Sequence, residues 1–282
     1  MQNIDAAVTK LRSLDASRYK ALEPQIVSTL ASCIELVGKS MSDRAEEYKT
    51  EAMRIFNSNR IIATIKIEAR DPCDASIAGL GSRGQRTICR DKLQQGDTGP
   101  ALVVIPGTSA IKMFAISKYE VSVGEVNAFC KNTRECSVSG GDGTLPATNM
   151  SVSLMNSYTK WLSKKTDKKY RLPTKTEWLY AAKAKQESLD PNRNCKLSTR
   201  GIQKGDDLVK AATGQQNDWG LVNYVGNAQE IVYDTGSKLI AIGGSYNDGM
   251  DECSFNTQTS HGGSADAYTG FRVLREISGA DS

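Results

Sequence analysis

Residues 217–230 have the sequence Asn-Asp-Trp-Gly-Leu-Val-Asn-Tyr-Val-Gly-Asn-Ala-Gln-Glu, and the rest of the chain is organised around this stretch. Its glycines and asparagines suit a compact loop rather than a long helix or a regular strand. Asn223, Gly226, Ala228 and Glu230 can aim oxygens at one point, as proteins do to hold calcium. The alternative is a tight loop in which Gly226 has an unusual φ and Glu230 forms a salt bridge. On these residues alone the alternative is favoured, because calcium loops usually carry more acid.

The composition bounds the class of protein. The 282 residues contain 39% hydrophobic residues, enough for a real core, and the formal net charge is only +4. Basic and acidic residues are interspersed, so we expect no nucleic-acid partner. No apolar run is as long as a membrane span, and the polar N-terminus does not resemble a signal peptide. If the protein acts outside the cytosol, we therefore expect this chain to be part of a larger or processed protein.

The seven cysteines predict the redox environment. Cys33 is alone in the N-terminal part, and the other six lie after residue 70. Six cysteines in a loop-rich domain favour disulfides and an oxidising compartment. Nearness in sequence suggests the pairs Cys73–Cys89 and Cys130–Cys136, which leaves Cys195–Cys253. The alternative is seven reduced thiols in a cytosolic protein.

The chain divides into three predicted parts. Residues 1–59 are expected to form a helical hairpin or coiled-coil stalk, with Pro24 as the first residue of its second helix. Residues 60–100 are expected to form an irregular connection that begins with a strand at 60–67. The pattern Gly79-x-Gly81-x-x-Gly84 in this connection matches a dinucleotide fingerprint in letters only, because no strand leads into it.

Residues 101–277 are expected to form an α+β domain with much irregular structure. The pattern predicts strands at 101–107 and 111–119 and helices at 123–132 and 151–164. Another helix is expected just after Thr174, because Glu177 stands three residues on and completes a capping box.

Seven segments of this domain, in order, resemble the formylglycine-generating enzyme and sulfatase-modifying factor family, which has a C-type-lectin-like fold. The segments are Val103–Gly107, Phe114–Val121, Leu145–Ser151, Arg171–Ala182, Asn217–Glu230, Gly243–Tyr246 and Thr269–Arg272. The resemblance covers about residues 100–276. It implies a structural calcium ion on the Asn223 side chain, the carbonyls of Gly226 and Ala228, and the Glu230 carboxylate, which reverses the preference stated for the loop alone.

The resemblance also implies an altered active site. Formylglycine-generating enzymes carry two cysteines, five apart, after Gly-Gly-Ser-Tyr, and these hold copper as a dithiolate. Here the two positions are Asp248 and Cys253. The iron-dependent relatives use several histidines, whereas this chain has only His261. Cys253 is best interpreted as a disulfide partner, and the weaker alternative is a nucleophilic thiol near His261.

We therefore expect a non-catalytic ligand-binding or sensory module, the periplasmic or cell-surface part of a signalling protein that is anchored elsewhere in the membrane. Segment 243–270 is the expected recognition surface, since polar, aromatic loops suit binding. Its expected ligand-binding residues are Tyr246, Asn247, Asp248, Asp251, Phe255, Asn256 and His261. A homodimer through the N-terminal helices is also expected. The alternatives are an oxidoreductase of this family with an altered active site, and a structural assembly domain.

Overall fold

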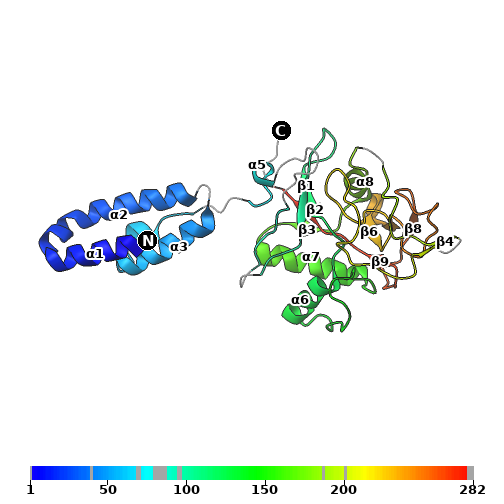
Figure 1. Cartoon of the computed structure of the whole chain (residues 1–282), viewed down its shortest axis with the longest axis horizontal. Helices are drawn as coiled ribbons and strands as arrows, with labels where there is room; N and C mark the ends of the chain where they lie inside the picture. The colour runs from blue at the N-terminus through cyan, green and yellow to red at the C-terminus, as the bar shows by residue number, and fades with distance from the viewer. Residues whose placement is uncertain are drawn as a thin grey trace. The chain divides into compact units, whose positions relative to one another are not determined.

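The computed structural model describes residues 2–38, 41–67, 71–78, 88–93, 97–185, 188–199 and 202–277 (Figure 1). It contains two compact units, Met1–Asp71 and Pro72–Ser282. The first unit extends beyond residue 59, where the sequence predicted its end, because Ile62 and Ile65 are buried in its core. The glycine pattern at 79–84 lies outside the described residues.

The N-terminal unit is helical, as the sequence predicts. It contains α1 (Gln2–Leu14), α2 (Ala16–Gly38), α3 (Ser42–Ile55) and α4 (Arg60–Ala63). The apolar seam of α2 packs against α3, with Val27 and Ile34 almost fully buried. Two predictions are wrong here. Pro24 lies inside α2 rather than at a helix start, and the strand expected at 60–67 is replaced by α4, which the Asn59 side chain caps by accepting from the Ile61 amide.

The second unit contains a four-stranded antiparallel sheet in the order β1-β2-β10-β3. The strands are β1 (Leu102–Ile105), β2 (Phe114–Ser117), β10 (Leu274–Glu276) and β3 (Tyr170–Arg171). Every residue of β1 and β2 is buried, which explains why these strands are continuous apolar runs instead of alternating ones. Both strands predicted from the sequence are therefore confirmed, and the chain's C-terminal part supplies the strand between β2 and β3.

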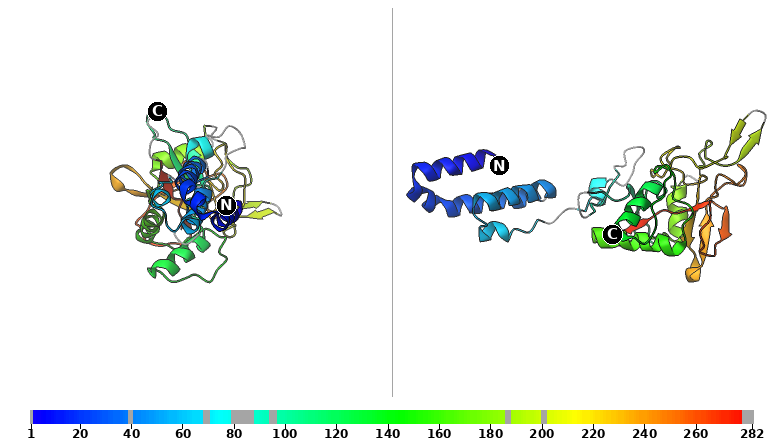
Figure 2. Two further views of the ribbon diagram at one scale, coloured as in Figure 1. Left: turned by 90° about the vertical axis from the view of Figure 1, so that its left-hand side faces the viewer. Right: turned by 90° about the horizontal axis from the view of Figure 1, so that it is seen from below.

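A second four-stranded sheet has the order β8-β7-β6-β9. It consists of β8 (Gln258–Ser260), β7 (Leu239–Ile242), β6 (Gln229–Tyr233) and β9 (Thr269–Gly270), and a 3-10 turn at Thr235–Ser237 joins β6 to β7. The short strand β9 runs parallel to β6, with Glu230 opposite Gly270. A separate hairpin of β4 (Leu197–Thr199) and β5 (Ile202–Lys204) projects from this unit in both views of Figure 2.

Three helices pack on these sheets: α6 (Val123–Thr133), α7 (Val152–Thr166) and α8 (Lys175–Lys183). A short helix, α5 (Ala75–Ala78), precedes them. The capping box predicted for Thr174 and Glu177 is confirmed at the start of α8, and α6 begins with a second one, Ser122 with Glu125. In one core, the ring of Tyr158 on α7 packs against Phe129 of α6 and against Phe271, while Trp178 of α8 lies in a second core.

All three predicted disulfides are confirmed. Cys73 is bonded to Cys89, Cys130 to Cys136, and Cys195 to Cys253, while Cys33 is free and exposed. Three disulfides in one domain indicate an oxidising environment. Within the described parts of the chain, none of the helices has the length and apolar character needed to cross a membrane.

Candidate functional site

The loop at 217–230 is shaped by its own asparagines and by one glycine. The Asn217 side chain accepts from the amides of Trp219 and Leu221, both at 3.0 Å, and so closes a tight turn. Gly226 has φ of +83°, and a Cβ there would meet the Asn194 carbonyl oxygen and the Cys195 sulfur at 2.8 Å. No other residue fits this position without strain. The unusual φ that the loop alone suggests for Gly226 is therefore confirmed.

Glu230 ends this loop inside the protein, with both carboxylate oxygens occupied. Its Oε1 accepts from Arg272 Nε at 2.8 Å, and its Oε2 accepts from the indole Nε1 of Trp178 at 2.6 Å. Burial raises the pKa of Glu230, and the neighbouring Arg272 opposes that effect. The salt bridge predicted for Glu230 as the alternative to calcium is therefore present, and it is a buried one.

Arg272 supplies the positive charge of this region. Its guanidinium is fully buried and also donates to four main-chain carbonyls. Nη1 donates to Ser117 and Lys118 at 3.1 and 2.8 Å, and Nη2 donates to Val222 and Asn223 at 2.5 and 2.9 Å. One side chain thus joins the end of β2, the loop at 217–230 and the start of β6.

Glu120 is a second buried carboxylate beside this pair. It accepts from the Asn227 side chain at 2.8 Å, from the Asn223 side chain at 3.2 Å and from the Ala228 amide at 3.0 Å. Burial raises the pKa of Glu120 to about 8, although Arg272, the Ala228 amide and the Asn227 side chain oppose the shift. Sequence reasoning missed this residue. The available signal was an acidic residue directly before Val121 in the segment Phe114–Val121, which the resemblance already marked.

The calcium set predicted from the family stays a prediction, and the structure shows which protein groups lie around its four residues. Calcium needs six to eight oxygen ligands whose lone pairs face it. Both oxygens of Glu230 accept hydrogen bonds from the protein, and the main-chain carbonyl of Asn223, which is not the predicted ligand atom, accepts from Arg272. The Asn223 amide nitrogen also points at Glu120 and at the Ala211 carbonyl. The amides of Gly226 and Ala228 donate to the Gly243 carbonyl and to Glu120 Oε1, and the guanidinium of Arg272 is the protein's own cation beside Glu230.

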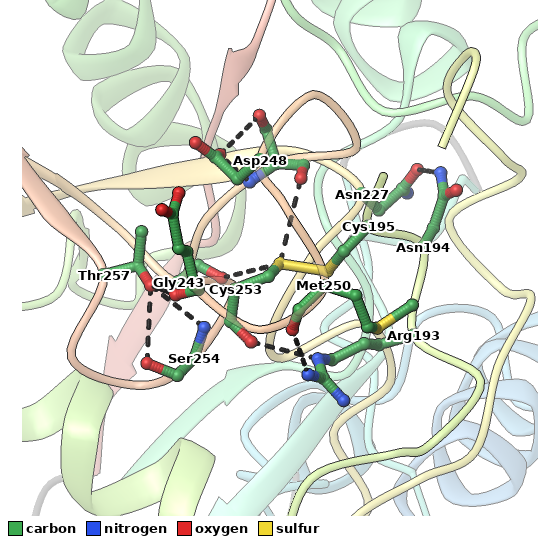
Figure 3. The surroundings of a disulfide bond; sticks show 12 residues. Arg193, Asn194, Cys195, Asn227, Gly243, Asp248, Met250, Cys253, Ser254 and Thr257 are labelled. Carbon is green, nitrogen blue, oxygen red and sulfur yellow. Dashed lines mark hydrogen bonds between the residues drawn. A yellow bond between two sulfur atoms is a disulfide. The ribbon is translucent and has the colours of Figure 1, made fainter. Parts of the chain in front are cut away.

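The position of the family's catalytic cysteine pair is occupied by structural groups (Figure 3). Cys253 is fully buried and forms the disulfide with Cys195, so its sulfur is neither a thiolate ligand nor a nucleophile. The Asp248 carboxylate accepts from the amide and hydroxyl of Ser245 at 2.7 and 2.8 Å and closes a turn. Arg193 holds the segment by donating to the carbonyls of Cys253 and Met250 at 3.0 and 2.6 Å.

His261 is likewise engaged away from Cys253. Its Nε2 lies 2.9 Å from Asp266 Oδ2, and its Nδ1 accepts from the Gly263 amide at 3.0 Å. The pair Cys253 and His261, considered as a weak catalytic candidate, is therefore wrong, because the sulfur is oxidised and both ring nitrogens are used by the loop at 261–266.

The expected ligand-binding residues separate into two groups. Asn247, Asp251 and Asn256 are exposed, and Tyr246 is half-buried with its ring 5.6 Å from that of Tyr268. Phe255 does not belong to the surface, since it is only 6% exposed and stacks on Tyr224. Asp248 and His261 are held by their own turns. The segment therefore presents a surface around Tyr246 and Tyr268, and Tyr268, which is 39% exposed, was not among the predicted residues.

Comparisons with known proteins support the sequence resemblance. A family model described as "Sulfatase-modifying factor enzyme 1-like domain" matches residues 104–277. No curated protein matches the chain. The chain is similar to the solved structure of PvdO from Pseudomonas aeruginosa, with 20% identity over 70% of this chain and 100% of that one, at a TM-score of 0.57. It is also similar to CarF, with 23% identity over 68% of this chain and 99% of that one, at a TM-score of 0.48.

Proposed function

Since the chain belongs to the sulfatase-modifying factor enzyme 1-like family, we propose that its domain is a binding module that keeps the family's scaffold without its copper-dependent oxidation. The single observation that carries this proposal is the disulfide between Cys195 and Cys253. A copper dithiolate needs two thiolates. One of the two positions is Asp248, which has no sulfur, and the sulfur at the other is bonded to Cys195.

The surface that we assign to binding is centred on Tyr246 and Tyr268. The two rings are in contact, and Tyr268 is exposed. Tyrosine gives a large contact area at a small cost in conformational entropy, and it is common in recognition loops. Asn247, Asp251 and Asn256 add exposed hydrogen-bonding groups on the same segment. The segment is held from beneath by the disulfide at Cys253 and by the two hydrogen bonds of Arg193.

We place the module outside the cytoplasm, in the periplasm or at the cell surface, as part of a larger signalling protein. The three disulfides support an oxidising compartment. A second copy of the chain is the proposed partner of the helical unit, where Leu14 and Leu36 are 74% and 65% exposed. Leu36→Glu is expected to lower the mass measured by sedimentation from dimer to monomer, with Gln25→Glu, another exposed change on α2, as the matched control. A monomeric wild-type chain would contradict this part.

Copper loading tests the central proposal. After copper loading and dialysis, the wild-type chain is expected to retain less than stoichiometric copper and to consume no oxygen with a thiol-containing peptide. The matched control is the double variant Asp248→Cys, Cys195→Ser, which frees Cys253 and restores two cysteines five apart. This variant is expected to retain copper. Stoichiometric copper or iron on the wild type, together with oxygen consumption, would instead support an oxidoreductase with an altered active site.

A further inference from the structure

A cavity of about 460 Å³ lies beside α6, and its lining residues do not include Tyr246 or Tyr268. Its apolar lining comes from both sides: Val123 and Val126 of α6, Leu145 and Met150 of the following loop, Leu154 of α7, and Leu208. Ligand cavities in proteins usually measure about 300–1,000 Å³ and have mostly apolar walls. In size and lining this cavity matches a site for a small molecule.

The α6 side of the cavity is held in place by covalent and hydrogen bonds. The Cys130–Cys136 disulfide ties the end of α6 to the loop that follows. Asn127 exchanges two hydrogen bonds with the backbone of Ser139, at 2.9 and 2.8 Å. The Val123 amide donates to the Leu145 carbonyl at 2.9 Å. Because these contacts fix the walls in advance, a ligand would lose little affinity to ordering the site.

The opposite side is formed by the segment that carries Leu208. The Val209 amide donates to the Asn227 side chain at 2.9 Å, and the Ala211 amide donates to the Thr144 carbonyl at 3.0 Å. Leu208 is half-buried and belongs to none of the hydrophobic cores of the described residues. Its apolar side chain therefore lines the cavity and is not part of a hydrophobic core.

The charge around the cavity selects against anions. Among the described residues that line it, Asp142 is the only one with a charged side chain, and none is lysine, arginine or histidine. Asp142 accepts from the amide and hydroxyl of Thr144 at 2.9 and 2.7 Å, and these bonds lower the pKa of its carboxyl. Lys210, which also lowers the pKa of Asp142, is not among the described lining residues, so an anionic ligand would meet this carboxylate without a cation in the cavity wall.

We propose that this cavity binds a small, uncharged, predominantly apolar molecule. The site goes beyond the recognition surface around Tyr246 and Tyr268, and either can exist without the other. A peptide segment would be a different occupant. Displacement of a bound dye by a small alcohol or by an apolar peptide distinguishes a small-molecule site from a peptide site. The walls are more apolar than polar, the volume suits one small molecule, and the exposed carboxylate of Asp142 disfavours an anion.

Fluorescence titration of the full chain with Nile red, a neutral apolar dye, tests the proposal. We expect saturable binding of one dye per chain, displacement by 1-octanol, and affinity at least about tenfold higher than for the anionic dye anilinonaphthalene sulfonate. Leu208→Asp is expected to weaken Nile red binding by at least about tenfold, because it places a charge in an apolar wall. Val138→Asp is the matched control. Val138 is an exposed apolar residue of the neighbouring loop that does not line the cavity, so its change should leave affinity within about twofold.

Near-UV circular dichroism establishes that each variant is folded. Thr148→Trp is a second variant, which fills the cavity from a half-buried lining position and should also abolish dye binding. The proposal is overturned if the wild type shows no saturable binding of Nile red. It is also overturned if Val138→Asp weakens Nile red binding as much as Leu208→Asp does. Displacement by an apolar peptide but not by 1-octanol would also overturn it, and would make the cavity a peptide site.

Discussion

Replacing Arg272 with alanine is the sharpest test of how the site is held together. The change removes a fully buried guanidinium whose nitrogens donate to Glu230 and to the carbonyls of Ser117, Lys118, Val222 and Asn223. Glu230 keeps only its bond from Trp178 and becomes a buried charge without a counter-charge. The four carbonyls lose a donor in a space from which water is excluded.

The magnitude follows from the burial of the pair. Removing one partner of a buried salt bridge costs about 3–5 kcal/mol, mainly because the other charge is left uncompensated. Glu230 can escape part of this cost by taking up a proton, since its pKa is already raised by burial. We therefore expect Arg272→Ala to lower the free energy of unfolding by about 3–5 kcal/mol. For a domain of this size, the melting temperature should fall by about 6–20 °C.

Urea denaturation of the full chain, followed by tryptophan fluorescence, measures the effect. Arg171→Ala is the matched control in the same unit, because Arg171 pairs with Glu177 and Glu276 with a third of its side chain exposed. Arg171→Ala should lower the free energy of unfolding by only about 1 kcal/mol. In the Arg272→Ala background, Glu230→Gln should cost less than in the wild type, since it removes the uncompensated charge. The reasoning is refuted if Arg272→Ala costs no more than Arg171→Ala, or if coupling to Glu230→Gln is below about 0.5 kcal/mol.

Three further predictions concern the same domain. If Arg272 alone balances Glu230, the melting temperature of the wild type should be equal in excess EGTA and in millimolar calcium; a calcium-dependent rise would support the calcium set of Asn223, Gly226, Ala228 and Glu230. Stability should fall as pH rises from about 4.5 to about 8, because the folded state retains a proton on Glu120, with its pKa raised to about 8, that the unfolded chain has lost. Urea denaturation across this range should show a smaller fall for Glu120→Gln, and equal slopes would contradict the assignment. Cys195→Ser opens a cross-link between residues 58 apart and should lower the free energy of unfolding by about 4 kcal/mol in the same assay. Non-reducing peptide mapping that found Cys253 unpaired in the wild type would remove the basis for that figure.

The features that could be predicted from the sequence are those that local rules decide. The capping box at Thr174 and Glu177 depends on residues three apart, and the structure contains it. Two disulfides join cysteines close in sequence, which left Cys195 and Cys253 as the third pair. The apolar runs of β1 and β2 are long enough to identify as buried strands.

The features that could not be predicted depend on packing between distant segments. Residues 60–67 are rich in isoleucine, and a short apolar run suits a strand as well as a buried helix. Helix α4 forms because Ile62 fits the core that α2 and α3 make. Phe255 lies in a polar segment that suggested exposure, yet Tyr224 offers a ring to stack on and buries it.

The role of Glu230 has the same cause. The local sequence shows that the loop at 217–230 is rich in oxygen-bearing groups. A buried carboxylate at its end requires a positive charge nearby, but the local sequence does not say which group supplies that charge. That choice is made by strand register. Because β9 runs parallel to β6 with Gly270 opposite Glu230, the chain continues so that Arg272 reaches the carboxylate. Trp178, from a helix well before the loop in the chain, takes the remaining oxygen. The sequence analysis identified the segment Thr269–Arg272 but did not pair Arg272 with Glu230. Asking which cation a buried carboxylate at position 230 would face could have suggested this pair. In this domain the carboxylate faces a side chain of the protein itself, because Arg272 pairs with Glu230 at 2.8 Å inside the fold.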